Sequence, residues 1–133
     1  MKKIILVLSL LSISLFAAVK HEYASQKLLD SKVKIIDIRT PAEWHETGLL
    51  KGSIPIMFFN EERKFNMQKF LSELNKHIKP GEEFAIICRT GSRTAMLADY
   101  LDKELGYKVI NIRGGILYAI GNHLPIEPYP PKK

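Results

Sequence analysis

The sequence contains a single cysteine, Cys88, among its 133 residues. One cysteine cannot form an intramolecular disulfide, so a disulfide-stabilised scaffold is excluded. Glycine and proline are also scarce, at 8 and 7 residues, which excludes a collagen-like chain. With 46% hydrophobic and 26% charged residues, the composition is that of a folded chain rather than a disordered one. The length fits one globular domain.

Signals for several common ligand classes are missing as well. The four histidines, at positions 21, 45, 77 and 123, have no metal-ligand spacing, so we expect no metal. There is no Walker loop and no dinucleotide fingerprint, and we expect no other cofactor. The formal net charge is +6, but the basic residues are scattered and lack interleaved aromatic residues. We therefore expect no nucleic-acid partner.

Residues 1–19 have the layout of a secretory signal peptide, with two lysines near the start, an apolar stretch over 4–16 and small residues at 17–19. The apolar stretch is shorter than the roughly 20 residues that a membrane-spanning helix needs. The cleavage site is imperfect, because a bulky residue stands where a small one is preferred. We expect a periplasmic or secreted protein. An uncleaved membrane anchor, the one case with a membrane contact, and a cytosolic core helix are the alternatives.

Strand and helix patterns alternate over residues 20–127, and a proline-rich tail, predicted to be frayed, follows over 128–133. Apolar runs predict strands over 33–38, 84–87 and 109–112, and a broken apolar run covers 53–58. Helical patterns cover 22–29, 66–78, 94–105 and 116–120, with a helical turn at 41–44. This alternation predicts an α/β fold with a central parallel sheet and helices on both faces. Ligands of such folds bind beyond the carboxyl ends of strands, here after Ile38 and Ile87.

Cys88 lies at one of these strand ends, in a loop that leads into a predicted helix. The loop reads Cys88, Arg89, Thr90, Gly91, Ser92 and Arg93. Backbone N–H groups of such a loop can surround an anion, and the helix dipole presents its positive end. Two arginines add positive charge, which favours a thiolate, and the glycine lets the loop curve. These residues predict an anion cradle around a nucleophile. An inert, buried cysteine is the alternative.

This loop resembles the active-site loop of the rhodanese family of sulfurtransferases. Three further blocks, over residues 35–44, 48–55 and 111–115, resemble family blocks in the family's order. Together the resemblance covers about residues 23–125 and implies a rhodanese-like fold. One departure is Leu49, which stands where the second block usually carries a histidine.

The resemblance implies a sulfurtransferase that acts through a persulfide. Cys88 would take the sulfane sulfur of thiosulfate or polysulfide and pass it to a thiophilic acceptor, such as cyanide, a thiol or a protein. It implies that residues 89–93 bind the substrate, although Arg93 could instead be tied to a carboxylate that shapes the loop. Asp37 and Arg39 would shape the site, and a simple ion pair or turn cap is the other interpretation.

Two other functions are open to a chain with this loop. Four residues separate Cys88 from Arg93, whereas cysteine-based phosphatases have five, so the cradle suits one sulfur better than a phosphate. This argues against phosphatase or arsenate reductase chemistry. A rhodanese-like binding or redox-sensing module without thiosulfate activity is the second alternative.

Overall fold

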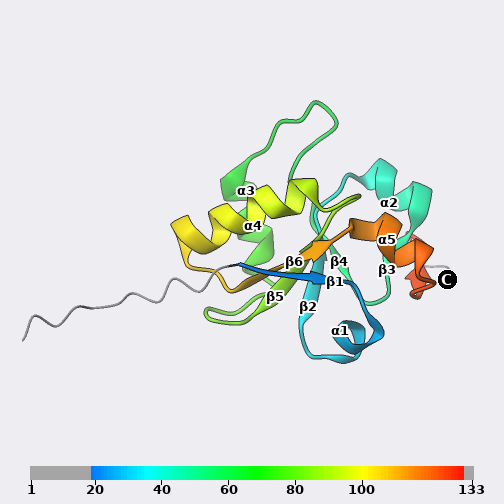
Figure 1. Cartoon of the computed structure of the whole chain (residues 1–133). Helices are drawn as coiled ribbons and strands as arrows, with labels where there is room; N and C mark the ends of the chain where they lie inside the picture. Colours follow the sequence, from blue (N-terminus) through cyan, green and yellow to red (C-terminus); the bar gives the residue numbers. More distant parts are fainter. Residues whose placement is uncertain (1–18, 131–133) are drawn as a thin grey trace, which may run out of the picture.

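The computed structural model describes residues 19–130 of the chain (Figure 1). Its centre is a five-stranded sheet in the order β1-β6-β5-β2-β4, in which every neighbouring pair is parallel. The sheet strands are β1 (Lys20–Tyr23), β2 (Lys34–Asp37), β4 (Ile54–Pro55), β5 (Phe84–Ile87) and β6 (Val109–Arg113).

Helices cover both faces of this sheet. They are α1 (Gln26–Asp30), α2 (Pro41–Thr47), α3 (Met67–Leu74), α4 (Ser92–Leu105) and α5 (Gly115–Gly121). Side chains of α3 and α4 belong to the apolar cluster on one face, and side chains of α1 and α5 belong to the cluster on the other face. The predicted α/β fold with a central parallel sheet and helices on both faces is confirmed.

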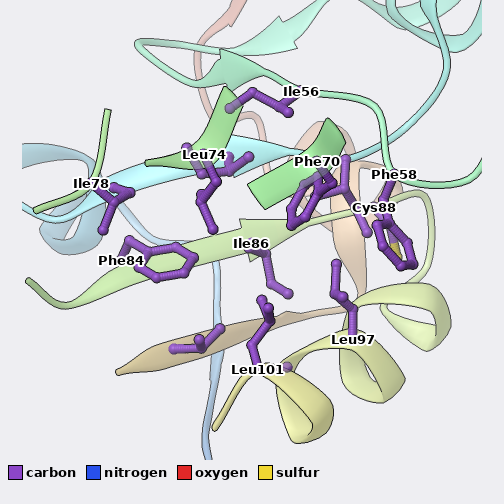
Figure 2. Close-up of a cluster of buried hydrophobic side chains, with 14 residues drawn as sticks. Ile56, Phe58, Phe70, Leu74, Ile78, Phe84, Ile86, Cys88, Leu97 and Leu101 are labelled. Carbon is purple, nitrogen blue, oxygen red and sulfur yellow. The ribbon is translucent and has the colours of Figure 1, made fainter. Parts of the chain in front are cut away.

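Strand β5 shows why the sheet is apolar on both sides. Phe84 and Ile86 point into the cluster with α3 and α4, whereas Ala85 and Ile87 point into the cluster with α1 and α5. All four are fully buried, so an uninterrupted apolar run is the pattern that a doubly covered strand requires. Figure 2 shows the first cluster, in which Cys88 lies beyond the end of β5 among apolar side chains.

The predicted helix over 22–29 is wrong in its first part. Lys20–Tyr23 forms β1, which pairs with β6, and the helix begins only at Gln26 after an N-cap by Ser25. All four residues of β1 are exposed, so the strand carries no alternation of apolar and polar residues that the sequence could reveal. Backbone pairing with a distant strand decides its conformation.

The predicted helix over 66–78 is too long. Asn66 caps α3 by accepting from the N–H of Lys69, and the helix ends at Leu74. Ile78 is nevertheless buried, because the chain continues as turns that carry its side chain into the core. The apolar spacing that includes Ile78 therefore reflects burial of the side chain and not a continuous helix.

A second, two-stranded sheet was not predicted. Strand β3 (Leu49–Leu50) pairs in antiparallel fashion with β7 (Ile126–Glu127), close to the C-terminal end of the described residues. Leu49, the residue that departs from the family pattern, is buried and lies opposite Glu127. The tail is also packed in part, because the Tyr129 ring lies 5.0 Å from the His45 ring, centroid to centroid.

The predicted signal peptide lies outside the described residues, apart from Val19. Val19 packs against the cluster of α3 and α4 directly before β1 begins. Within residues 19–130, no helix combines the length and the hydrophobicity that crossing a membrane requires.

Candidate active site

The loop that carries Cys88 connects a central strand to the longest described helix. Cys88 directly follows β5, and Ser92 begins the 14-residue α4. Because β5 lies between β6 and β2, the loop leaves the middle of the sheet at its carboxyl edge. Gly91 is the N-cap of α4 with φ of 99°, and a Cβ there would lie 3.1 Å from the amide nitrogen of Gly114. The backbone conformation and the close approach both favour glycine.

The start of α5 holds the loop from the other side. The N–H of Ile116 donates to the Cys88 carbonyl at 2.9 Å, and the N–H of Leu117 donates to the Arg89 carbonyl at 3.2 Å. Gly115 lies so close that a Cβ would overlap both carbonyl groups. These bonds satisfy N–H groups that the first turn of α5 would otherwise leave without partners. The loop backbone is therefore fixed by two helices.

The sulfur of Cys88 is fully buried inside this loop. The N–H of Gly91 donates to Sγ at 3.1 Å, and the Oγ1 atom of Thr94 lies 3.5 Å from Sγ. Both partners belong to the start of α4, so the sulfur faces the positive end of that helix dipole. An amide donor and a helix N-terminus both stabilise an anionic sulfur. The arrangement suits a cysteine that reacts as a nucleophile.

Arg93 is tied to a carboxylate of α2. Its Nη1 and Nη2 atoms donate to Oε2 and Oε1 of Glu43 at 3.1 and 2.9 Å. Glu43 also accepts from the N–H of Thr40 at 3.1 Å and so completes the capping box of α2. Burial raises the pKa of Glu43, but the bonds from Arg93 and Thr40 outweigh burial and hold that pKa below its ordinary value. An ionised Glu43 therefore anchors the loop to α2.

The other predicted binding residues lie at the rim of the loop. The Nη1 atom of Arg89 lies 3.6 Å from the Oε2 atom of Glu46, in a loose pair at the surface. Thr90 and Ser92 are exposed. The structure thus brings residues 88–93 together, with the Gly91 amide on the sulfur and the hydroxyl-bearing residues toward solvent.

Asp37 and Arg39 form a second, fully buried ion pair. The Arg39 Nε atom donates to Oδ1 of Asp37 at 3.0 Å, and Nη2 donates to Oδ2 at 2.8 Å. The indole N–H of Trp44 donates to the same carboxylate at 3.0 Å. Asp37 ends β2 and Trp44 belongs to α2, so these bonds attach α2 to the sheet.

The Arg39 guanidinium also forms hydrogen bonds with the two residues that precede β3. It donates to Oγ1 of Thr47 at 2.9 Å and to the carbonyl of Gly48 at 3.0 Å. Within residues 19–130, no side-chain hydrogen bond of Asp37 or Arg39 reaches the loop over 88–93. The buried pair instead holds α2 in position, and α2 carries Glu43, which binds Arg93 of the loop.

Sequence reasoning missed Glu43 and Thr94. Thr40 and Glu43 have the spacing of a capping box, but the partner of Glu43 is Arg93, 50 residues further along the chain. No sequence feature marks Thr94, apart from its place directly after Arg93 in the first turn of α4. Neither the long-range pair nor the contact with the sulfur has a local signal in the sequence.

A cleft of about 770 Å³ lies next to the loop. The start of α2, the start of α4 and the segment between β4 and α3 line it. The lining residues are Thr40, Ala42, Glu43, Phe59, Asn60, Glu61, Arg63, Ser92, Arg93 and Met96. Figure 1 shows this β4–α3 segment projecting beyond the helices. The cleft combines apolar surface with charges of both signs.

Comparison with known proteins places the chain in a family. The model of the rhodanese-like domain matches residues 20–118, so the chain belongs to the rhodanese family. A protein of Allochromatium vinosum named "Sulfurtransferase" is 31% identical over 109 residues, which are 81% of this chain and 92% of that protein. Thiosulfate sulfurtransferase 18 of Arabidopsis thaliana is 26% identical and covers 77% of this chain and 78% of its own length.

Solved structures agree with this assignment. The crystal structure of a rhodanese-like domain protein from Staphylococcus aureus superposes with a TM-score of 0.60 at 26% identity. The match covers 82% of this chain and 99% of that one. The fold and the named relatives therefore support membership of the general sulfurtransferase family.

Proposed function

We propose that the protein transfers sulfane sulfur through a persulfide on Cys88. The thiolate of Cys88 attacks the outer sulfur of thiosulfate, the S–S bond of the donor breaks, and sulfite leaves with the bonding electron pair. Cys88 then carries a persulfide anion, Cys–S–S⁻. A cyanide ion or a thiolate attacks its outer sulfur, which leaves as thiocyanate or as a new persulfide, and the Cys88 thiolate is regenerated. Polysulfide can replace thiosulfate as the donor in the first step.

One observation carries this proposal, namely the position of the Cys88 sulfur at the N-terminus of α4. The Gly91 amide already donates to this sulfur at 3.1 Å. Both the thiolate and the persulfide are anions, so the same donor and the same helix dipole stabilise the protein in both half-reactions. Both relatives described above are named sulfurtransferases, and these names support the same chemistry.

The acceptor must come from outside the chain. Cys88 is the single cysteine, so no second thiol of the protein can take up the transferred sulfur. The cleft beside the loop offers an acceptor both apolar contact, from Phe59 and Met96, and charge, from Arg63 and Glu61. A low-molecular-weight thiol or a segment of an acceptor protein fits such a mixed surface better than cyanide alone.

We further propose that the reaction takes place outside the cytosol. The proposal rests on the cationic and apolar pattern of residues 1–19. Expression of the full chain in a bacterial host should yield protein in the periplasmic fraction that begins near Val19 or Lys20. Full-length protein in the membrane fraction would instead support an uncleaved anchor.

Mass spectrometry tests the persulfide directly. After treatment with thiosulfate, the intact protein should gain the mass of one sulfur atom, and cyanide should remove it. Cys88→Ser is the matched control, because it replaces only the sulfur and should never gain mass. If neither thiosulfate nor polysulfide changes the wild-type mass, the binding or redox-sensing module becomes the better interpretation.

A further inference from the structure

A chain of four polar side chains leads from the buried sulfur to the protein surface. The Thr94 hydroxyl lies 3.5 Å from the Cys88 sulfur and 2.5 Å from Oδ1 of Asn111, to which it donates. The side-chain amide of Asn111 bonds to Nδ1 of His21 at 3.0 Å. Thr94 and Asn111 are buried, at 0% and 3% exposure, whereas His21 is exposed. The chain crosses α4, β6 and β1, which are adjacent elements.

The Thr94 hydroxyl has a single hydrogen, and the direction in which it points decides how these hydrogen-bonded side chains can act. A threonine hydroxyl has one hydrogen to donate and can accept others. In the arrangement described, that hydrogen points to Asn111 and, at the longer distance of 3.2 Å, to the Gly91 carbonyl, so Thr94 can only accept from the sulfur. The Gly91 carbonyl also accepts from the N–H of Ala95, so it keeps a partner when the Thr94 hydrogen turns away. A neutral Cys88 thiol satisfies this arrangement by donating its S–H hydrogen. A thiolate or a persulfide has no hydrogen to give, so in this arrangement Thr94 offers it nothing and the Gly91 N–H is its donor. A desolvated anion gains from a second donor.

A half-turn of the Asn111 side-chain amide would make the Thr94 hydroxyl this second donor. The two ends of the amide have nearly the same shape, so both orientations fit the same space. In the turned orientation, Nδ2 donates to Thr94, and the Thr94 hydrogen is free to donate to the anionic sulfur. The Oδ1 atom then faces His21, whose Nδ1 must carry a hydrogen. In both arrangements, every side chain from Cys88 to His21 has a hydrogen-bond partner.

We propose that Thr94 is a catalytic residue, whose hydroxyl donates a hydrogen bond to the anionic sulfur of Cys88. Asn111 and His21 are positioning residues, which release the hydroxyl hydrogen when the Asn111 amide turns. This inference rests on the proposed persulfide chemistry, because the thiolate and the persulfide are the anions that receive the hydrogen. It predicts that Nδ1 of His21 accepts a hydrogen bond when Cys88 is neutral and donates one when the sulfur is charged.

Two substitutions at one position test the catalytic role. Thr94→Val has nearly the same shape but no hydroxyl, whereas Thr94→Ser keeps the hydroxyl. At neutral pH, Thr94→Val should slow both alkylation of Cys88 by iodoacetamide and sulfur loading from thiosulfate by about ten-fold, because a hydrogen bond to a charged group is lost. The pH profile of alkylation should move to higher pH. Thr94→Ser should stay within about three-fold of the wild type. Ser53→Ala, which removes a buried hydroxyl beside β4, is the control for lost packing.

Nitrogen-15 NMR of the histidine rings tests the positioning role. In Cys88→Ser, which holds a neutral hydroxyl, His21 should have an unprotonated Nδ1. In the wild type loaded with sulfur, the Nδ1 signal of His21 should shift toward that of a protonated nitrogen, at the same pH. His77, which is also exposed and lies in the turns after α3, should not change. Thr94→Val should reduce the shift at His21, since its side chain can no longer pass on the change at the sulfur.

The outcomes separate this inference from the proposed function. If the wild type gains no sulfur, the proposed function fails before Thr94 is tested. If the wild type gains sulfur and a folded Thr94→Val variant reacts at the wild-type rate, Thr94 has no catalytic role. An unchanged His21 signal upon loading overturns the positioning role of Asn111 and His21.

Discussion

The structure contains two arginine–carboxylate pairs with the same chemistry and different surroundings. Asp37 and Arg39 are two residues apart and both side chains are 0% exposed. Glu43 and Arg93 are 50 residues apart, and their side chains are 22% and 25% exposed. The first pair attaches α2 to β2, whereas the second attaches the loop that carries Cys88 to α2.

This difference indicates a division of labour. Both charges of the inner pair are desolvated, so removing one partner leaves the other charge without compensation in the core. The outer pair keeps some contact with water, which weakens its contribution to stability. However, it fixes the position of the segment that carries Cys88. We therefore expect the inner pair to govern stability and the outer pair to govern activity.

The largest expected effect follows from breaking the inner pair. Arg39→Met should lower the free energy of unfolding by about 3–5 kcal/mol, because Asp37 keeps a buried charge without its main partner. Urea denaturation measures the change. A double variant, Asp37→Leu with Arg39→Met, should recover part of the loss, since no charge is left in the core. A loss below about 1 kcal/mol in the single variant would remove the distinction between the two pairs.

Breaking the outer pair should affect the reaction more than the fold. Arg93→Ala should lower the rate of sulfur loading by about 10- to 100-fold, because a small displacement of a reacting atom is costly. Stability should fall by only about 1 kcal/mol. Arg93→Lys is the matched control, because it keeps the charge and loses the two-pronged geometry. Equal losses of transfer rate in Arg93→Ala and Arg39→Ala would contradict our description of the cradle.

The pH dependence of stability isolates Glu43. The pKa of Glu43 lies below its ordinary value of 4.5, so the folded protein holds this carboxylate more strongly ionised than the unfolded chain does. Its stabilising contribution is complete above the ordinary value and is lost as the pH falls through the folded value. Thermal melts over acidic pH should therefore show a shallower decline in Glu43→Gln than in the wild type. The exposed Glu46→Gln should leave the decline unchanged.

The smallest expected effect concerns the support of α2 by the tail. The Tyr129 ring contacts Trp44 and His45, at centroid distances of 5.4 and 5.0 Å. Tyr129→Ala should lower the unfolding free energy by about 0.5–1.5 kcal/mol, as expected for an aromatic pair. Tyr100→Ala, at an exposed tyrosine of α4, is the control. An effect equal to that of Arg39→Met would mean that the tail, rather than the buried pair, holds α2.

The sequence predicted the parts of the fold that burial encodes. The run over 84–87 is buried on both faces and matches β5, and the helix over 94–105 begins two residues earlier than expected. β1 and β3 could not be predicted, because a short strand is defined by the backbone of its partner.

The same distinction, between what local sequence encodes and what long-range packing decides, holds within the site. Residues 88–93 form one segment, so their proximity followed from the chain itself. The contacts of Glu43 and Thr94 depend on how α2 and β6 pack beside that segment, and local sequence does not carry this information.

The pairing of β1 with β6 also has a consequence for the order in which the molecule is completed. His21 lies opposite Asn111 in the register of these strands, 90 residues further along the chain. Among the described elements β1 is synthesised before the other strands, yet its neighbour in the sheet, β6, is made only after β2 to β5. Parallel contacts between such distant segments form slowly. We therefore expect the contact of His21 with Asn111 to form late in folding, after the shorter-range contacts around Cys88.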